Sequence, residues 1–231
     1  MSAFIFDAET TGMEDPVRLV EAAWLKIASP LCLEKTDQMW CGRFNPGKQI
    51  ELGALATHHI LDEELIQCPS WEEFSLPADC QYLVGHNVDY DWKVVGCPDV
   101  KRIDTKALAT WLLPELDSRS QSALVYHFSS GNREVAREML RNAHSAMGDV
   151  DNLRFVLGFL LRLIFERKDV RIPDDLTWED VWGFSEKARV PTIMPFGKHK
   201  GMPIKDVPAD YKAWLLRQND VDPYLVKALS V

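Results

Sequence analysis

The chain has 231 residues, of which 46% are hydrophobic and 26% are charged. This composition is typical of one globular domain with an appendage, and it excludes an intrinsically disordered chain. The formal net charge is −9, but residues 187–231 carry eight Lys or Arg and four Asp, a net charge of +4. Residues 1–186 therefore carry 18 basic and 31 acidic residues, a net charge of −13, and the basic surplus lies in the C-terminal part.

The N-terminal sequence, MSAFIFDAE, has no basic leader before its apolar residues, which argues against a secretory signal. The longest apolar stretch, Leu153–Phe165, contains Arg154 and Arg162 and is far shorter than the roughly 20 residues of a membrane span. These features predict a cytoplasmic protein with no membrane partner. Five cysteines form no C-x-x-C pair, so we expect free thiols and no disulfide framework.

The first part of the sequence predicts an antiparallel meander of three strands. The apolar run Ala3–Ala8 ends in a Thr-Thr-Gly turn and suits a buried central strand. Two further strand-like runs, Leu19–Ile27 and Leu33–Phe44, are separated by Ser-Pro, and the second ends in Asn-Pro-Gly. From Leu52 to Phe74 the pattern becomes helical.

The next part predicts helices and strands in alternation. A strand at Gln81–Val84 leads into Gly-His-Asn, and a helix starts at about Asp89. A short strand at Lys101–Ile103 is followed by a helix that begins near Asp104 and that Pro114 closes.

The C-terminal third predicts a long helix, a linker and a small module. From about Ser145 to Arg167 the apolar residues have the spacing of a buried helical face, which should pack on the sheet. Residues 169–191 are acidic and contain proline, so we predict a linker with one or two helical turns at Trp178–Phe184. The predicted domains are therefore residues 1–168 and a basic module at 192–231.

Acidic residues follow two of the predicted strands. Asp7 and Glu9 stand two apart at the end of the first strand, so their side chains point to the same face. Carboxylates are natural ligands of Mg²⁺ or Mn²⁺, and two such ions about 4 Å apart can clamp both reacting oxygens of a phosphodiester. Alone, the pair is weak evidence, because two acids at a strand end are more often a solvated turn. Asp91 in GHNVDYD, and Asp149 five residues after His144 in HSAMGD, complete a set of four acids and one histidine.

The ordered segments DAETTG, GHNVDYD and HSAMGD resemble the three exonuclease motifs of the DEDDh family, which is DnaQ-like and lies within the ribonuclease H-like superfamily. The resemblance covers about residues 3–166, with weaker echoes in LVEAAW, THHI and IDTKALA. It departs from the family at Ala8, where Thr is common, and at Met147 and Gly148 before the last Asp. It implies an α/β fold, with a ribonuclease H-like mixed five-stranded sheet flanked by helices.

The resemblance also implies a role for each motif residue. Asp7, Glu9 and Asp149 would hold the ion that binds the attacking water, with Asp7 bridging to a second ion. Asp91 would complete the shell through water. His144 would act as the general base, a role that suits an imidazole with an ordinary pKa of about 6.5. The implied cofactors are two Mg²⁺ or Mn²⁺ ions per site.

A pocket for the terminal nucleotide is implied in the same way. Its expected lining residues come from the first motif and from the THHI segment, and they are Thr10, Thr11, Gly12, Met13 and His58.

The segment Phe196–Asp220 resembles the C-terminal module of the exodeoxyribonuclease X branch of the family. Gly197 and Gly201 flank a basic turn that can bring the ammonium groups of Lys198 and Lys200 near a phosphate. The alternative is a solvated turn whose lysines only confer solubility. The module's own core is expected to hold Tyr211, Trp214 and Leu215.

These patterns predict a metal-dependent 3′–5′ exonuclease that releases nucleoside monophosphates from a nucleic acid 3′ end, with DNA favoured over RNA by the resemblance of the tail. One alternative is an RNA 3′ exonuclease of the oligoribonuclease or RNase T type, which shares all five catalytic residues. Another is a catalytically silent nucleic-acid clamp, against which the intact residue set argues. Neither a homodimer nor a polymerase partner is readable from the sequence.

Overall fold

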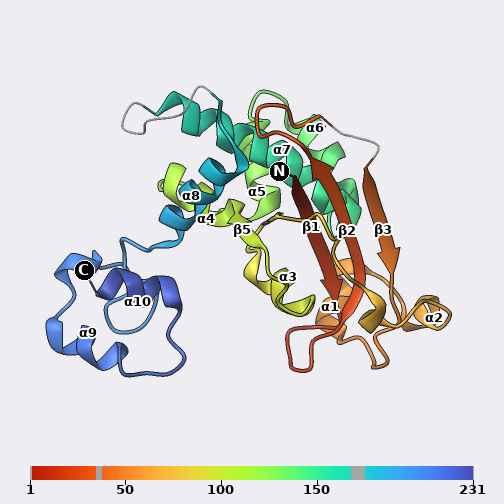
Figure 1. The fold of residues 1–231 in the computed structure, drawn as a ribbon, viewed down its shortest axis with the longest axis horizontal. Helices are drawn as coiled ribbons and strands as arrows, with labels where there is room; N and C mark the ends of the chain where they lie inside the picture. The colour runs from red at the N-terminus through yellow and green to blue at the C-terminus, as the bar shows by residue number, and fades with distance from the viewer. Residues whose placement is uncertain (1, 35–37, 168–174, 231) are drawn as a thin grey trace.

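The structure, a computed structural model, describes residues 2–34, 38–167 and 175–230. Its larger part is a mixed sheet flanked by helices, and a smaller helical unit follows at the C-terminal end (Figure 1). The predicted α/β architecture with a small C-terminal module is therefore confirmed.

The sheet has five strands in the order β3-β2-β1-β4-β5. Strand β2 is antiparallel to both β1 and β3, whereas β4 is parallel to both β1 and β5. The predicted meander is confirmed, although its third strand is shorter than expected and part of that segment lies outside the described residues. The strands are Ala3–Thr10 (β1), Leu19–Ile27 (β2), Met39–Arg43 (β3), Tyr82–Gly85 (β4) and Lys101–Asp104 (β5).

Helices make up about half of the remaining described chain, and they include α5 and α6 in the stretch between Pro114 and Ser145, where the sequence analysis predicted no element. The α-helices are Leu52–His58 (α1), Asp62–Leu65 (α2), Asp89–Val94 (α3), Thr105–Leu112 (α4), Gln121–Phe128 (α5), Arg133–Met139 (α6), Ala146–Glu166 (α7), Trp178–Arg189 (α8), Ala209–Leu215 (α9) and Pro223–Leu229 (α10).

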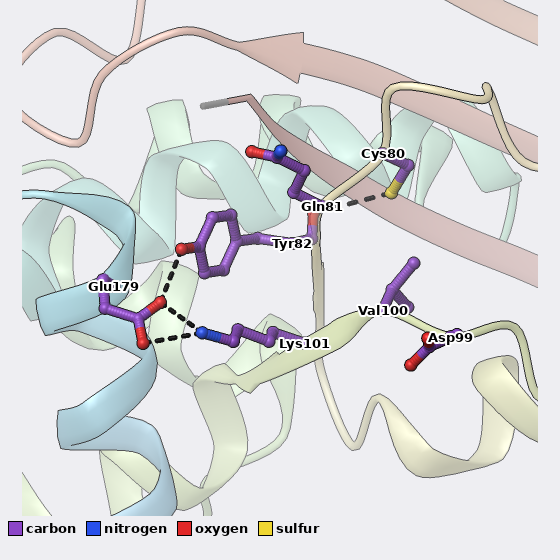
Figure 2. Close-up of a pocket in the computed structure, with 7 residues that line it drawn as sticks. All are labelled: Cys80, Gln81, Tyr82, Asp99, Val100, Lys101 and Glu179. Atoms are coloured by element: carbon purple, nitrogen blue, oxygen red, sulfur yellow. Dashed lines mark hydrogen bonds and ion pairs between the residues drawn. The ribbon is translucent and has the colours of Figure 1, made fainter.

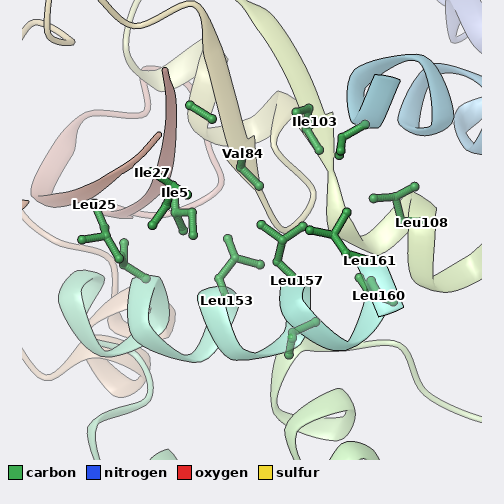
Figure 3. Close-up of a cluster of buried hydrophobic side chains, with 14 of the residues drawn as sticks. Ile5, Leu25, Ile27, Val84, Ile103, Leu108, Leu153, Leu157, Leu160 and Leu161 are labelled. Atoms are coloured by element: carbon green, nitrogen blue, oxygen red, sulfur yellow. The ribbon is translucent and has the colours of Figure 1, made fainter. Parts of the chain in front are cut away.

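Helix α7 covers one face of the sheet, as its apolar spacing predicts. Leu153 and Leu157 are fully buried one turn apart and belong to the same cluster as Ile5 and Leu25 from the strands (Figure 3). The helix starts where the Ser145 hydroxyl accepts a hydrogen bond from the Gly148 amide (3.3 Å). Within the described ranges no helix, α7 included, is long and apolar enough to cross a membrane.

An aromatic cluster covers the opposite face of the sheet. Phe4 and Phe6 alternate with the residues that face α7, because successive side chains of a strand point to opposite faces. The Phe4 ring meets Trp24 edge-on at 5.3 Å, and Phe6 lies 5.8 Å from Phe74. The central strand is therefore buried on both faces, which fixes the position of its last residues.

Helix α8 is longer than the one or two turns expected within the predicted linker. Its twelve residues begin at a capping box formed by Thr177 and Asp180. Trp178, Val181 and Phe184 are buried in the same cluster as α7. Acidic composition predicted a linker here, but every third or fourth residue of this segment is apolar and packs on the sheet domain. The division into domains stays a prediction.

Arg189, the last residue of α8, lies at the junction with the C-terminal unit. Its side chain is only 4% exposed and donates to the Asp89 carboxylate of α3 at 2.9 Å and to the Tyr224 hydroxyl of α10 at 2.6 Å. The Asp104 and Glu186 carboxylates lie 3.6 and 3.9 Å away. One buried guanidinium thus joins the sheet domain to the module.

The C-terminal module has a small core of its own. The cluster includes Met194, Ile204, Leu215 and Leu225, and Tyr211 packs against it. Leu215 is buried as predicted, but Trp214 is 48% exposed, so its assignment to the core was wrong. A helix as short as α9 buries one narrow stripe, and Leu215 occupies that stripe in place of its larger neighbour.

Candidate active site

Strand β1 carries two carboxylates at its C-terminal end. Asp7 and Glu9 follow Ala3 and Ile5 at intervals of two residues, so they share the face on which α7 packs. Glu9 is paired in register with Glu21 of β2. The strand therefore holds two acids beneath the start of α7.

The first turn of α7 brings a third carboxylate to the same place. Ligand atoms of Asp7, Glu9 and Asp149 lie within 4.8 Å of one another. The turn before the helix packs tightly, because a Cβ added at Gly148 would lie 2.0 Å from the Asn142 carbonyl oxygen. Glycine at this position therefore lets the first turn of the helix approach the Asn142 carbonyl. The helix begins at Ala146 although Gly148 has a weak helix propensity.

Hydrogen bonds hold the Asp149 side chain in position. The His144 amide donates to one carboxylate oxygen at 2.8 Å, and the Gln121 side-chain amide donates to the other at 3.0 Å. Gln121 also donates to the Asp149 carbonyl at 2.9 Å. Nothing in the sequence around Gln121 marks it, and sequence reasoning missed it.

Asp91 approaches from α3 and is 6% exposed. It is not within the 4.8 Å group, but its negative charge is the strongest charged influence that raises the pKa of Asp7. We call Asp7, Glu9, Asp91 and Asp149 the carboxylate cluster. Three of the four predicted metal ligands are therefore close enough to share one ion, and Asp91 is near enough for its charge to act on Asp7.

Burial and mutual repulsion change the acidity of the cluster. Burial raises the pKa of Glu9 to about 7, and the charges of Asp149 and Glu21 add to the rise. Burial raises the pKa of Asp91 to about 8 and that of Asp7 well above its ordinary value. No ion pair with Lys or Arg reaches these carboxylates within the part of the chain that the structure describes. Four repelling oxygen-donor side chains without a cation fit a site for hard divalent ions.

Glu21 supports the cluster from β2, and sequence reasoning did not assign it a role. Its buried carboxylate accepts a hydrogen bond from the Ala146 amide (2.9 Å), at the first residue of α7. It also forms an ion pair with Arg43 at 2.9 Å. The position of Glu21 within the apolar run LVEAAW could have revealed this role. A charged residue is rarely buried without a partner, so an acid in a buried strand predicts specific contacts.

His144 stands at the edge of the cluster with its side chain exposed. Its backbone has a φ of 65°, which is uncommon for a residue with a side chain. The bond from its amide to Asp149 keeps the residue next to the carboxylates. Its role as a base stays a prediction.

A pocket of about 260 Å³ lies next to Glu9, between β1 and α1. Its lining includes the predicted residues Thr10, Gly12, Met13 and His58. His58 accepts the Ile60 amide on Nδ1 (3.0 Å), so its Nε2–H donates to the Thr10 carbonyl (3.2 Å).

Thr11 does not line that pocket. Its side chain is fully buried, and its hydroxyl accepts a hydrogen bond from the Arg18 amide at 3.1 Å. Tyr90 takes its place, with a hydroxyl 2.7 Å from that of Thr10 and donating to the Gly12 carbonyl at 2.9 Å. Thr11 therefore shapes the turn, whereas Tyr90, to which the sequence analysis assigned no role, reaches the pocket.

The basic turn does not lie beside the carboxylates. Lys198 and Lys200 are exposed on the C-terminal module, which Figure 1 shows beyond α3 and β5, away from the end of β1. Any ligand that touches both regions must extend along the molecule.

A larger pocket, of about 560 Å³, lies at the opposite, N-terminal ends of β4 and β5 (Figure 2). Three of its polar side chains bond one another, because Glu179 accepts hydrogen bonds from the Tyr82 hydroxyl (2.6 Å) and from Lys101 (2.5 Å). These contacts fasten α8 to the sheet. We therefore assign this pocket a structural role.

We expect the metal-free protein to lose stability as the pH rises from about 5 to about 8.5. The pKa values of Glu9 and Asp91 in the folded state are about 7 and about 8, above those of unfolded carboxylates, so the folded state binds more protons in this range. Stability from these groups is complete at low pH and is lost as the pH rises through those values. At about 1.4 kcal/mol for each pH unit between pH 5 and the folded-state pKa of each group, the loss should amount to several kcal/mol, observable as a fall in Tm measured in EDTA.

Asp7→Asn is the control for this titration, because it removes one repelling charge and keeps the side-chain shape. The difference in Tm between wild type and variant cancels the titration of distant groups. A difference that stays constant from about pH 5 to about 8.5 would show that the cluster does not titrate as described.

The comparison with known structures matches exonucleases. Exonuclease X in complex with 5′-overhanging duplex DNA aligns with a TM-score of 0.56 and 20% identity, over 78% of this chain and 99% of that one. E. coli exonuclease I in a zinc-bound complex with single-stranded DNA aligns with a TM-score of 0.54 and 19% identity, over 71% of this chain. The alignment spans 42% of the exonuclease I chain.

The comparison with family models adds a match in the C-terminal part of the chain. Residues 187–222 match the family model described as a putative quorum-sensing-regulated virulence factor. No curated protein sequence matches the chain at a significant level. The strand order, the flanking helices and the structural matches agree, and the chain therefore has the ribonuclease H-like fold that exonucleases X and I share.

Proposed function

We propose that this protein is a metal-dependent 3′–5′ exonuclease that hydrolyses the terminal phosphodiester of DNA and releases nucleoside monophosphates. One observation carries the proposal. Three carboxylates from β1 and α7 have ligand atoms within 4.8 Å of one another, and Asp91 adds its charge from α3. Buried acids that repel one another cost stability, and function is the common reason for such a cost.

The donor set suits two Mg²⁺ or Mn²⁺ ions, because all the donors are carboxylate oxygens. Asp7, Glu9 and Asp149 would hold one ion, and Asp7 with Asp91 would help to hold the second. When bound, such ions polarise the phosphodiester and lower the pKa of water. The protein's part is to fix the carboxylates, which the bonds from His144 and Gln121 to Asp149 accomplish.

His144 is the proposed general base. Its exposed imidazole is free to face substrate and solvent, and its amide bond to Asp149 keeps it near the cluster. In this role the neutral ring accepts a proton from the attacking water.

The pocket beside Glu9 is the proposed site of the terminal nucleotide. Its volume of about 260 Å³ is small, below the ~300–1,000 Å³ of typical ligand pockets, and suits one nucleotide better than a continuing strand. A pocket of this kind beside the carboxylates favours removal of nucleotides from the end of a strand over cleavage within it.

The preference for DNA rests on the structural relatives and on the tail. Exonucleases X and I are solved in complexes with DNA, and the module carrying Lys198 and Lys200 resembles that of the exodeoxyribonuclease X branch. In this proposal residues 1–168 form the catalytic domain and residues 192–231 form a module that contacts phosphates.

The test is degradation of 5′-labelled single-stranded DNA and RNA of matched sequence, with Mg²⁺ or with EDTA. We expect a metal-dependent ladder that appears faster on DNA. His144→Ala should slow it by about 10²- to 10⁴-fold, the usual contribution of a general base. His127→Ala, which changes another exposed histidine on α5, is the matched control and should leave the rate unchanged.

Faster laddering of RNA would assign the protein to the RNA exonucleases that share the five residues. Binding of both substrates without cleavage of either would contradict the proposal and favour a nucleic-acid clamp.

A further inference from the structure

The surface of the C-terminal module carries a row of aromatic rings. The His199 ring lies 4.6 Å from that of Tyr211, and Tyr211 lies 5.4 Å from Trp214. His199 and Tyr211 are half-buried, and Trp214 is 48% exposed. We call His199, Tyr211 and Trp214 the ring row. The core of the module is filled without Trp214, so the fold of the module does not explain why a tryptophan stands at this exposed position.

The basic turn is packed directly against this row. Gly197 has a φ of 71°, and a Cβ at this position would lie 2.6 Å from the Tyr211 hydroxyl. Glycine therefore allows the turn to touch the ring. The Lys200 amide donates to the Gly197 carbonyl at 3.1 Å, which closes the turn. Lys198 and Lys200 are thus held beside the rings.

The cations around the ring row are available to a ligand. Among the described residues, Lys198, Lys200 and Arg217 form no ion pair, and all three are exposed. Arg217 is adjacent to the ring row, since its amide donates to the Trp214 carbonyl (3.1 Å). The nearest acid in the helix, Asp210, has one carboxylate oxygen engaged by the Tyr211 amide (2.9 Å).

Charge separates this surface from the rest of the molecule. Residues 187–231 carry a net charge of +4, and residues 1–186 carry −13. A polyanion is therefore repelled by the sheet domain as a whole and attracted by the module. Flat rings interleaved with unpaired cations complement a ligand that alternates planar bases with phosphates.

We propose that the ring row and the basic turn form a binding platform for single-stranded nucleic acid, with bases stacked on Trp214 and Tyr211 and phosphates near Lys198 and Lys200. The inference rests on the proposed nuclease function and adds that the substrate is bound as a single strand. Unpaired bases offer their faces to aromatic side chains, whereas a duplex encloses its base faces in the stack. The platform therefore selects single strands.

The platform has a fixed place relative to the catalytic residues. Arg189 bonds Tyr224 of the module and Asp89 of α3, the helix that also carries Asp91. In Figure 1 the module lies on the α3 side of the sheet domain. A strand held on the ring row thus runs past α3 before its end reaches the carboxylate cluster.

The test is fluorescence anisotropy of labelled oligothymidine and oligouridine, about 15 nucleotides long, measured with the full chain in EDTA across a range of salt concentrations. EDTA prevents metal-dependent cleavage, so the measurement reports binding. Trp214→Ala should weaken binding about tenfold at every salt concentration, because stacking is insensitive to salt. Trp214→Phe should recover most of the affinity.

Two further variants separate stacking from charge. Lys198→Gln with Lys200→Gln should reduce the slope of log affinity against log salt by about 1.4, the loss of two phosphate contacts on a single strand. Phe165→Ala removes an exposed ring of α7, remote in sequence from the platform, and is the matched control that should leave binding unchanged.

Unchanged affinity of Trp214→Ala, in a variant that melts like the wild type, would overturn the platform and leave the exposed ring to a protein partner. Equal weakening for a blunt duplex would overturn its selection of single strands. Equal weakening of oligothymidine and oligouridine binding by Trp214→Ala would support base stacking that does not distinguish deoxyribose from ribose. Failure of the nuclease proposal is distinguishable, because it appears as an absence of cleavage by the wild type in Mg²⁺.

Discussion

We expect Asp7→Asn to slow DNA cleavage by about 10³-fold or more, equivalent to a barrier about 4 kcal/mol higher. Asp7 is at the centre of the carboxylate cluster, since burial raises its pKa and the charges of Asp91, Asp149 and Glu9 all add to the rise. Asparagine keeps the shape of the side chain but removes its charge and weakens its hold on a divalent ion. A single-turnover rate measured with saturating Mg²⁺ gives the effect directly.

The fold of this variant should survive, because the substitution relieves repulsion among buried acids. Saturating Mn²⁺ at about 100 times its Kd stabilises a binding site by about 2.7 kcal/mol, so the wild type should gain several degrees in Tm. Asp7→Asn should gain much less. Asp117→Asn, at an exposed position outside the cluster, controls for a general effect of charge. Full activity in Asp7→Asn would refute the assignment of the metal site.

The second large effect is expected at the junction between domain and module. Arg189→Ala should destabilise the protein by about 3 kcal/mol and lower the Tm by roughly 6–12 °C. The guanidinium is 4% exposed and lies within 4 Å of three carboxylates and the Tyr224 hydroxyl. Asp89 keeps its partner Arg102, whereas Asp104 and Glu186 lose this cation.

Arg162→Ala is the matched control, because it removes an arginine whose bond to Glu166 (2.9 Å) lies on an exposed surface, with the side chain 73% exposed. An exposed pair one helical turn apart contributes about 0.5 kcal/mol or less. Arg189→Lys should be intermediate, since an ammonium cannot reach partners on three elements as a planar guanidinium does. Equal losses for Arg189→Ala and Arg162→Ala would show that the junction does not depend on this residue.

Local patterns in the sequence were sufficient to predict much of the sheet domain. The alternation in β1 placed Asp7 and Glu9 on one face, and the apolar spacing of α7 placed that helix on the sheet, because both patterns depend only on the geometry of a single element. The ordered motifs then identified Asp91 and Asp149 as partners, which the structure brings into electrostatic contact with β1.

Contacts between segments that are distant in the chain could not be predicted from the sequence. Gln121 reaches Asp149 only because α5 packs beside α7, and Glu21 matters only because β2 pairs with β1 and lies under the start of α7. Composition likewise underestimated the length of α8, whose apolar stripe is narrow and set among acids. A side-chain partner across the fold leaves no periodic signal along the chain.

The sequence by itself thus determined the strands, the long helix and the identities of the cluster residues, since propensity, alternation and motif spacing are local properties. Only the tertiary structure decided that Tyr90 and not Thr11 reaches the pocket, that Arg189 joins module to domain, and that Trp214 faces solvent while Leu215 is buried. The physical reason is competition for space. Neighbouring residues of similar character offer the same local signal, and packing against distant elements selects which of them is enclosed.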